Sequence, residues 1–402
     1  MSPESHYQPR RSLVAAMVLQ YAVGGAIIPF ITLLLRDRGL SVEQISLVLL
    51  VSSAALLASP FVWGMLADRF LPLNRLFGIM NLLSLAALAG FGRQKSVAGL
   101  AVLFTLFYAC FQPAPMLVNA LCFRHLPRPL VQFAPLRMWG SVGWILPSLP
   151  IFVWLFWRPA GNFEFILYVT MALSLGMAGL SLVLPATPPG AGWRGHSSGP
   201  GLGYAEAVGR LLKNPNYLVL LISYFLISAS FTIQAFYSPP RLADLGLSRA
   251  WMGPVQSIGV AMEILMFRYR SVVIGHLSYA GSILFGCLVL TVRQLLFAYV
   301  TNLPALAISY LLVGVTVVFY HIGVSILVDA IATVEVKATA QTLLVLCGSG
   351  LGPMFANGAV GGLARVTGPD LKAVFLLGSV LAGLASGLIW WRSAQLVPHG
   401  SG

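Results

Sequence analysis

Hydrophobic residues run through this chain in long stretches, separated by short polar breaks. A helix that crosses a bilayer needs about 20 apolar residues, and the stretches reach that length. We expect the first to be a retained helix, because it has no small-residue cleavage pattern. The pattern predicts an all-α membrane protein with twelve transmembrane helices, near 13–35, 44–67, 74–92, 97–121, 135–157, 163–184, 216–238, 250–267, 272–298, 303–330, 340–364 and 371–391.

One polar stretch divides these runs into two sets of six. Residues 185–215 are rich in Pro, Gly and Ser, a composition typical of linkers. We expect flexible chain over 185–203 and a short amphipathic helix at the membrane surface over 204–213. The division predicts an N-terminal six-helix bundle at residues 1–184, a cytoplasmic linker, and a C-terminal six-helix bundle at residues 216–402.

The composition and the absence of certain motifs argue against several classes of function. Hydrophobic residues make up 58% of the chain and charged residues 9%, whereas soluble domains carry about 25% charge. The net charge of +13 would suggest a nucleic-acid partner in a soluble protein, but here Lys and Arg are scattered through loops, so we expect none. The four cysteines form no Cys-x-x-Cys pair, and no nucleotide-binding or hydrolase motif is present. We therefore expect no metal, no cofactor and no enzymatic activity.

The segment GMLADR, from Gly64 to Arg69, follows the second apolar run. It resembles the cytoplasmic loop signature of the major facilitator superfamily, and six helices, a linker and six helices are the arrangement of that family. The resemblance implies a gating loop in which Gly64 permits close helix approach while Asp68 and Arg69 pair across the bundle in one access state. The sequence departs from the signature after Arg69. We expect the cell (inner) membrane as location, with both termini cytoplasmic.

A second motif, RMWGS, begins at Arg137 in the fifth run. It resembles the nucleoside:proton symporter branch of the superfamily and the neighbouring phenylpropionate permease branch. The resemblance implies that Arg137, Ser141 and Trp144 contact substrate. Arg in hydrocarbon is costly unless it has a partner or an aqueous cavity, although Arg137 could also reach the membrane surface. The nucleoside symporters have a Gln where this chain has Val260, and their amides in the seventh helix have no direct match here.

Three ionisable residues interrupt the second set of runs: Glu263, Arg293 and His321. Charge at the bilayer centre costs at least about 2.5–3.5 kcal/mol, so such residues pair, face a cavity or become neutral. Their placement resembles both branches and, more distantly, lactose permease, which implies proton coupling. Lactose permease has a second Glu soon after its His, whereas the nearest acid here is Asp329. Glu263 is therefore the leading proton carrier and Asp329 the second.

A proton-coupling mechanism follows if Glu263 and Arg293 are neighbours. An adjacent guanidinium favours the ionised carboxylate and an apolar cavity favours the protonated one, so relative movement of the two would switch proton binding. The alternative is a static Glu263–Arg293 salt bridge that fixes helix packing. Other polar residues in the runs are candidates to contact substrate, or else to serve packing: Gln20, Tyr21, Asn119, Gln234 and Tyr320.

Together these features predict a secondary active transporter that imports a small organic solute with protons by alternating access. Nucleosides are slightly favoured over sugars and aromatic acids. The partners expected are substrate, protons and the lipid bilayer, with the protein a monomer. Two alternatives remain: a proton-antiport exporter of amphipathic compounds and a non-transporting membrane sensor.

Overall fold

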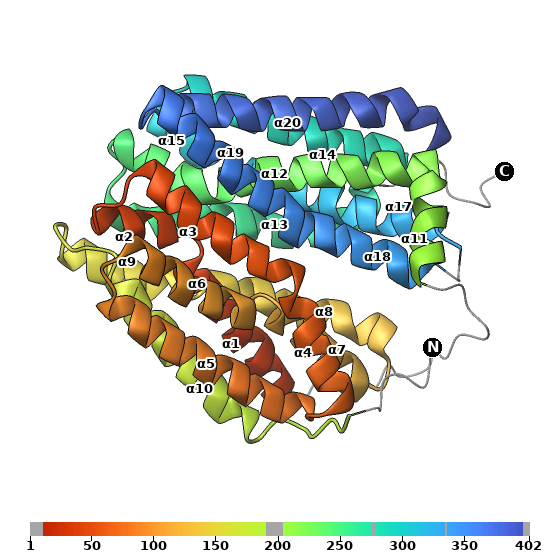
Figure 1. Cartoon of the computed structure of the whole chain (residues 1–402), viewed down its shortest axis with the longest axis horizontal. Helices are drawn as coiled ribbons and strands as arrows, with labels where there is room; N and C mark the ends of the chain where they lie inside the picture. The colour runs from red at the N-terminus through yellow and green to blue at the C-terminus, as the bar shows by residue number, and fades with distance from the viewer. Residues whose placement is uncertain (1–10, 190–203, 275–277, 334–335, 397–402) are drawn as a thin grey trace.

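The computed structural model describes residues 11–189, 204–274, 278–333 and 336–396 (Figure 1). Within these ranges ten helical segments are long and apolar enough to cross a bilayer. Two further helices, α10 (Phe165–Ser181) and α13 (Met252–Ile274), bring the number of spans to twelve. The prediction of an all-α membrane protein with twelve transmembrane helices in two six-helix bundles is confirmed.

Four of the six spans in the first bundle are broken near their middle. Pro29, Pro113 and Pro147 lie at three of the breaks, where their missing N–H groups interrupt the helical hydrogen bonds. A 3-10 turn at Ala55–Leu57 makes the fourth. The helices are α1 (Arg11–Ile27), α2 (Ile31–Asp37), α3 (Val42–Ala54), α4 (Ser59–Arg69), α5 (Leu73–Arg93), α6 (Val97–Phe111), α7 (Ala114–His125), α8 (Pro129–Ile145), α9 (Ser148–Trp157) and α10.

The second bundle contains two π-helical segments, Val317–Ile322 and Leu346–Leu351, in its fourth and fifth spans. Such segments are rare and frequently lie at functional sites. The helices of this bundle are α12 (Pro215–Asp244), α13, α14 (Tyr279–Tyr299), α15 (Leu303–Ile308), α16 (Leu311–Thr316), α17 (Gly323–Ile331), α18 (Lys337–Val345), α19 (Gly352–Thr367) and α20 (Leu371–Arg392).

The predicted boundaries in the second bundle are wrong chiefly between the eighth and ninth spans. The basic stretch 267–271 ends the eighth apolar run, yet the helix continues through it to Ile274. Arg is a good helix former, so basic residues end a hydrophobic run without ending a helix. The ninth span accordingly begins at Tyr279 and not near residue 272.

The segment between the bundles contains the predicted short helix. This helix, α11 (Tyr204–Lys213), packs against α12 and α18, with Ala207 and Leu211 buried and Glu206 and Arg210 paired on its exposed face. Its amphipathic character is therefore confirmed. The predicted flexible stretch falls mostly on residues 190–203, outside the described residues.

The buried apolar residues show how the bundles meet. One large cluster contains residues of both bundles, among them Phe91 and Phe163 from the first and Phe236 and Phe297 from the second. The other two clusters each belong to one bundle and lie toward the ends that carry Arg11 and α11. We call this end of the molecule the terminal side and the opposite end the far side. The two cores therefore merge on the far side and separate on the terminal side.

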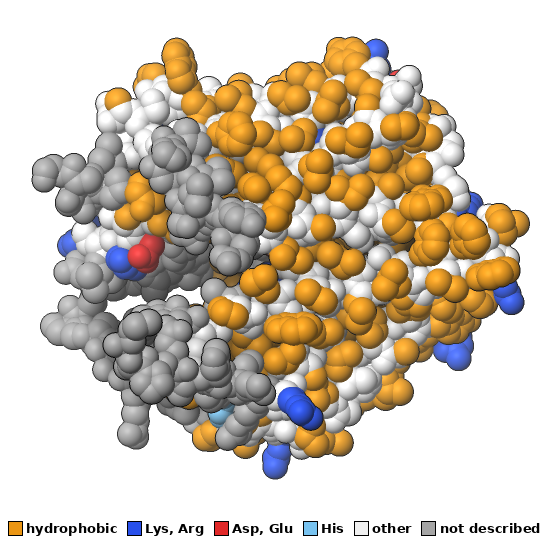
Figure 2. Space-filling model, turned by 180° about the vertical axis from the view of Figure 1, so that it is seen from behind, with side chains coloured by type: hydrophobic (Ala, Val, Ile, Leu, Met, Phe, Trp, Pro, Cys, Tyr) orange, Lys and Arg blue, Asp and Glu red, His pale blue; other side chains and the backbone are white. Residues whose placement is uncertain are grey.

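The outer surface suits contact with lipid. Large apolar side chains such as Trp157, Leu182 and Val366 are exposed, the last two by 84% and 85%. Figure 2 shows hydrophobic side chains spread over the face that it presents, with Lys and Arg near the edges. Because soluble proteins rarely expose continuous apolar surface of this extent, the arrangement fits a protein embedded in a bilayer.

Candidate functional site

A cavity of about 370 Å³ lies between the two bundles. Its volume falls in the range of small-molecule sites, roughly 300–1,000 Å³. Helices α1, α8 and α9 of the first bundle and α12, α13 and α14 of the second supply its polar lining, together with Tyr310, which directly precedes α16. The polar and aromatic residues concerned are Tyr21, Arg137, Ser141, Trp144, Ser148, Phe231, Gln234, Ser238, Gln256, Ser257, Glu263, Arg293 and Tyr310.

Glycines bring α1 and α8 together and so shape the wall of the first bundle. A Cβ atom on Gly25 would collide with the backbone of Trp144, and one on Gly143 with the backbone of Val18. This contact aligns Tyr21 with Arg137, whose guanidinium carbon lies 4.3 Å from the centre of the Tyr21 ring. The guanidinium is thereby oriented by an aromatic face, an arrangement that stabilises cations.

Glu263 stands on α13 and reaches across to the first bundle. Gly314 of α16 lets the tenth span approach the backbone at Glu263 closely. The half-buried carboxyl group lies near Ser141 and interacts electrostatically with Arg137, without an ion pair between the two among the described residues. The expected ion pair of Glu263 with Arg293 is not among the ion pairs of the described residues, although both residues line the same cavity.

Arg293 is almost completely buried, with 1% of its surface exposed. Its Nε donates a hydrogen bond to the carbonyl oxygen of Ser309 at 3.1 Å, and its guanidinium carbon lies 4.4 Å from the centre of the Tyr310 ring. The Tyr310 hydroxyl is fixed by Ser238 at 2.9 Å. Nη1 and Nη2 have no hydrogen-bond acceptor among the described residues. The side chain is therefore held firmly while its two outer nitrogens are unused.

Two glutamines add amide groups to the cavity. Gln234 is 2% exposed, and neither its amide nitrogen nor its amide oxygen has a partner in the described part of the chain. The amide nitrogen of Gln256 donates to the carbonyl of Pro29 at 3.2 Å, across the interface between the bundles. A buried amide without partners is costly and is typical of a site that receives a ligand.

Several predicted site residues lie outside this cavity. Gln20 accepts a hydrogen bond from Asn81 at 3.2 Å, and Tyr320 donates to Ser223 at 3.3 Å, so both are engaged in packing. Asn119 interacts with Tyr21, which lines the cavity, but does not line the cavity itself. Their predicted contacts with substrate remain predictions.

The two further candidates for proton coupling are also outside the cavity. His321 lies among three aromatic rings, those of Tyr224, Phe231 and Tyr320, with centroid distances of 5.2–5.6 Å. Its Nε2 has no partner within the described ranges. Asp329 is exposed and forms an ion pair with Lys337 at 2.9 Å. Proton coupling through either residue remains a prediction, and the structure does not bring them together with Glu263.

A comparison with protein families decides the classification. A family model described as the MFS_1 like family matches residues 11–377, nearly the whole chain. The chain belongs to the MFS_1 like family. The predicted membership of the major facilitator superfamily is confirmed, and the protein is a multi-pass secondary transporter and not an enzyme.

Individual relatives agree with placement in the MFS_1 like family. The chain is 24% identical to the putative nucleoside transporter YegT of Escherichia coli K12, over 84% of this chain and 80% of YegT. It is 26% identical to the maltose permease of Geobacillus stearothermophilus, over 84% and 83%. A crystal structure of the nucleoside transporter NupG superposes with a TM-score of 0.83 at 17% identity, covering 95% of this chain and 98% of NupG. The fold is therefore shared with NupG.

In this member of the MFS_1 like family, charged residues close the far side of the cavity. Arg249 donates to Asp37 at 2.6 Å, and Arg365 donates to Glu43 at 2.6 Å; both pairs join the two bundles. A third pair, Arg36 with Asp244, does the same. Surface ion pairs are individually weak, but three of them resist separation of the bundles together.

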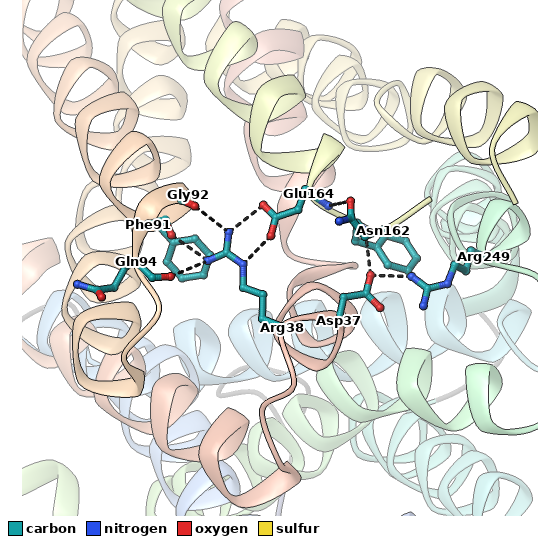
Figure 3. Close-up of polar contacts among 9 residues, drawn as sticks. Asp37, Arg38, Phe91, Gly92, Gln94, Asn162, Glu164 and Arg249 are labelled. Atoms are coloured by element: carbon teal, nitrogen blue, oxygen red, sulfur yellow. Dashed lines mark hydrogen bonds and ion pairs between the residues drawn. The ribbon is translucent and has the colours of Figure 1, made fainter. Parts of the chain in front are cut away.

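A network within the first bundle supports this closure (Figure 3). Arg38 donates from Nε and Nη2 to the two carboxylate oxygens of Glu164 at 2.7 and 2.8 Å, and from Nη1 to the carbonyl of Phe91 at 2.8 Å. Asp37 accepts from the backbone N–H of Phe163 at 2.9 Å besides its bond to Arg249. The two-point Arg–carboxylate contact fixes the geometry of the neighbouring Asp37.

The predicted gating loop lies on the opposite, terminal side. Asp68 at the end of α4 is 3.9 Å from Arg124, so it pairs within the first bundle. Arg69 is exposed. A Cβ atom on Gly64 would meet no atom of the described chain within 4 Å. The close helix approach expected at Gly64 is thus absent from this conformation, in which the cores are separated on the terminal side.

Replacing Gly64 by Val should slow transport without unfolding the protein. The new methyl groups meet open space in this conformation but collide once the terminal side closes, and such overpacking costs roughly 1–3 kcal/mol. We expect the initial uptake rate to fall about tenfold or more. Gly179→Val in α10 is the matched control, because Gly179 also faces open space. Equal rates for both variants and the parent protein would contradict a gating role for Gly64.

Sequence reasoning missed several residues of the cavity. Gln256, Ser238 and Tyr310 all line it, and none was a candidate. A weak signal was present for Gln256 and Ser257, which are adjacent polar residues inside an apolar run. No comparable signal marks Tyr310, since tyrosine is common in membrane helices and its role depends on packing against Arg293.

Proposed function

We propose that this protein imports nucleosides together with protons across the cell inner membrane. The observation that carries the proposal is that Glu263 of the second bundle lines one cavity with Arg137 and Ser141 of the first and interacts electrostatically with Arg137. Residues 1–184 and 216–402 act as the two moving units, in a monomer with both termini in the cytoplasm. The names of relatives support the substrate class, since YegT is named as a putative nucleoside transporter and NupG as a nucleoside transporter.

The lining of the cavity suits a nucleoside. Trp144 and Tyr21 offer aromatic faces against which a base stacks. Gln234 and Gln256 offer amides that match the donor and acceptor edge of a base. The sequence lacks the amides that the nucleoside symporters carry in their seventh and eighth helices, and these two glutamines, on the corresponding helices, supply the same chemistry from other positions.

The coupling of transport to protons follows from the position of Arg137. Because Glu263 and Arg137 belong to different bundles, a rocking movement changes the distance between them, whereas Arg293 belongs to the same bundle as Glu263. Proximity of the guanidinium favours the ionised carboxylate, and separation in an apolar cavity favours the protonated form. Glu263 thus releases its proton when the cavity faces the terminal side and takes one up when it faces the far side.

The packing of the bundles supports the direction of access. The far side is closed by three ion pairs between the bundles, and the cores separate toward the terminal side. With both termini in the cytoplasm, this conformation is inward-facing. Release of proton and nucleoside into the cytoplasm is then the step that the conformation represents.

Reconstitution into liposomes tests the proposal. With one proton carried per nucleoside, an inward gradient of one pH unit should drive about tenfold accumulation of radiolabelled uridine or adenosine, since tenfold corresponds to about 1.4 kcal/mol. A protonophore should abolish it. Uptake of maltose or phenylpropionate instead of nucleosides would contradict the substrate class. Efflux of amphipathic dyes without nucleoside uptake would contradict import.

A further inference from the structure

The charged residues of the cavity do not balance. Two arginines and one glutamate line it: Arg137, Arg293 and Glu263. The carboxylate of Glu263 interacts with Arg137, and no carboxylate of the described residues forms an ion pair with Arg293. A buried charge without a partner is expensive, so its retention calls for a partner that arrives from outside.

The groups around Arg293 hold its guanidinium in one orientation, so its hydrogen-bond donors are preorganised. The Nε bond to Ser309 and the two rings beneath the guanidinium, Phe297 at 5.0 Å and Tyr310 at 4.4 Å, leave it little freedom. Its unused Nη1 and Nη2 are hydrogen-bond donors only, because a guanidinium has no acceptor. An Arg fork of this kind suits an oxygen with free lone pairs and repels an amino group.

A second buried polar group, an amide that can both donate and accept a hydrogen bond, stands on the same wall. Gln234 lies one helical turn before Ser238 on α12, so the two side chains share a face of that helix. Ser238 holds Tyr310, and the Tyr310 ring lies against Arg293. The buried amide of Gln234, whose two polar atoms have no partner in the described part of the chain, thus belongs to the same part of the cavity as the guanidinium.

We infer that Arg293 and Gln234 form a subsite for an oxo or oxyanion group of the substrate, which selects among substrates by that oxygen. The inference rests on the proposed function as far as nucleosides are concerned. Bases that carry an oxo group at the pyrimidine 4-position or purine 6-position fit the subsite, as in uridine and inosine. Cytidine and adenosine place an amino donor there, from which the guanidinium of Arg293 cannot accept a hydrogen bond, so that only the amide oxygen of Gln234 could receive it.

The same chemistry has a second source, the carboxylate of an aromatic acid. A carboxylate would also accept from Nη1 and Nη2 and would neutralise Arg293. An oxo base binds as a neutral molecule and leaves the charge in place. The two sources therefore share the subsite and differ in which compound binds more tightly.

Competition against uptake in proteoliposomes tests the inference. A buried site built to form a hydrogen bond with one group of its substrate binds an analogue that lacks this group much more weakly. We therefore expect uridine and inosine to compete about 10- to 100-fold better than cytidine and adenosine. In Arg293→Gln this ratio should fall to about one, and Gln234→Leu should reduce it. Arg158→Gln is the control, because Arg158 also lies over an aromatic ring, that of Trp154 at 4.1 Å, but outside the cavity.

Melting temperatures of the purified variants show whether they fold. If Arg293→Gln does not fold, Arg293→Lys is the second variant, because it keeps the positive charge but lacks the planar pair of Nη donors. It should still reduce the advantage of uridine and inosine over cytidine and adenosine in competition. Equal competition by all four nucleosides in the parent protein would overturn the inference, and so would an unchanged ratio in a folded Arg293 variant. Phenylpropionate that competes through Arg293 while no nucleoside does would support the subsite and contradict the proposed nucleoside transport.

Discussion

Replacing Glu263 by Gln should abolish accumulation of nucleoside against its gradient while leaving exchange across the membrane in place. The amide keeps the size of the carboxyl group and can still form hydrogen bonds, so an interaction with the nearby Ser141 is still possible. The amide binds no proton, so movement of the substrate is no longer coupled to movement of a proton down its gradient. Accumulation should fall from about tenfold per pH unit to the equal concentrations of passive equilibration.

The measurement is paired uptake and counterflow in the same proteoliposomes. Uptake under an inward pH gradient reports coupling, and exchange of labelled for unlabelled nucleoside without a gradient reports the remaining transport cycle. The initial rate of the parent protein should depend on pH, and that of Glu263→Gln should not. Accumulation by Glu263→Gln with unchanged pH dependence would remove Glu263 as the proton carrier.

Asp329 offers a matched control, since it is the second acid that the sequence proposes. Its carboxylate is exposed and paired with Lys337, away from the cavity. Asp329→Asn should therefore keep full coupling. Loss of coupling in Asp329→Asn, with coupling retained in Glu263→Gln, would identify Asp329 and not Glu263 as the proton carrier.

Much of the fold could be predicted because the bilayer imposes one length scale on every span. Backbone N–H and C=O groups in hydrocarbon must form hydrogen bonds within the segment itself, so an apolar run of about 20 residues forms a transmembrane helix. Interruption by Pro147 or by the π-helical segment at residues 317–322 does not change the span, only its local path. Boundaries failed where charge was taken for a loop, as in the extension of α13 to Ile274.

The sequence predicted which charged residues belong to the site better than it predicted which of them lie next to one another. Arg137, Glu263 and Arg293 could be found individually because charge in an apolar run is conspicuous. Which of them are neighbours depends on how the bundles face each other, and no periodicity within one helix contains that information. The charge pattern suggested an interaction of Glu263 with Arg293, whereas the guanidinium that interacts electrostatically with Glu263 in the structure is that of Arg137 in the first bundle.

Removing the positive partner of Glu263 should weaken nucleoside binding strongly. Arg137→Gln removes the guanidinium with which the Glu263 carboxylate interacts, and it also removes a donor to the substrate. Hydrogen bonds to charged groups are worth about 1.5–3 kcal/mol. We expect the affinity measured by competition to fall by roughly 10- to 100-fold. Lys337→Gln, which breaks an exposed ion pair, should leave affinity unchanged.

The double variant Arg137→Gln, Glu263→Gln separates the two causes of that loss. When both charges are absent, no unpaired carboxylate remains, and two amides of similar size can bond to each other and to Ser141. Because the residues interact, their effects should not add, and the double variant should bind nucleoside better than Arg137→Gln alone, by a coupling energy of about 0.5–3 kcal/mol. Proton-driven accumulation should remain absent. Additive losses would show that Arg137 acts on the substrate alone, and coupling through a contact between the bundles would then have no support.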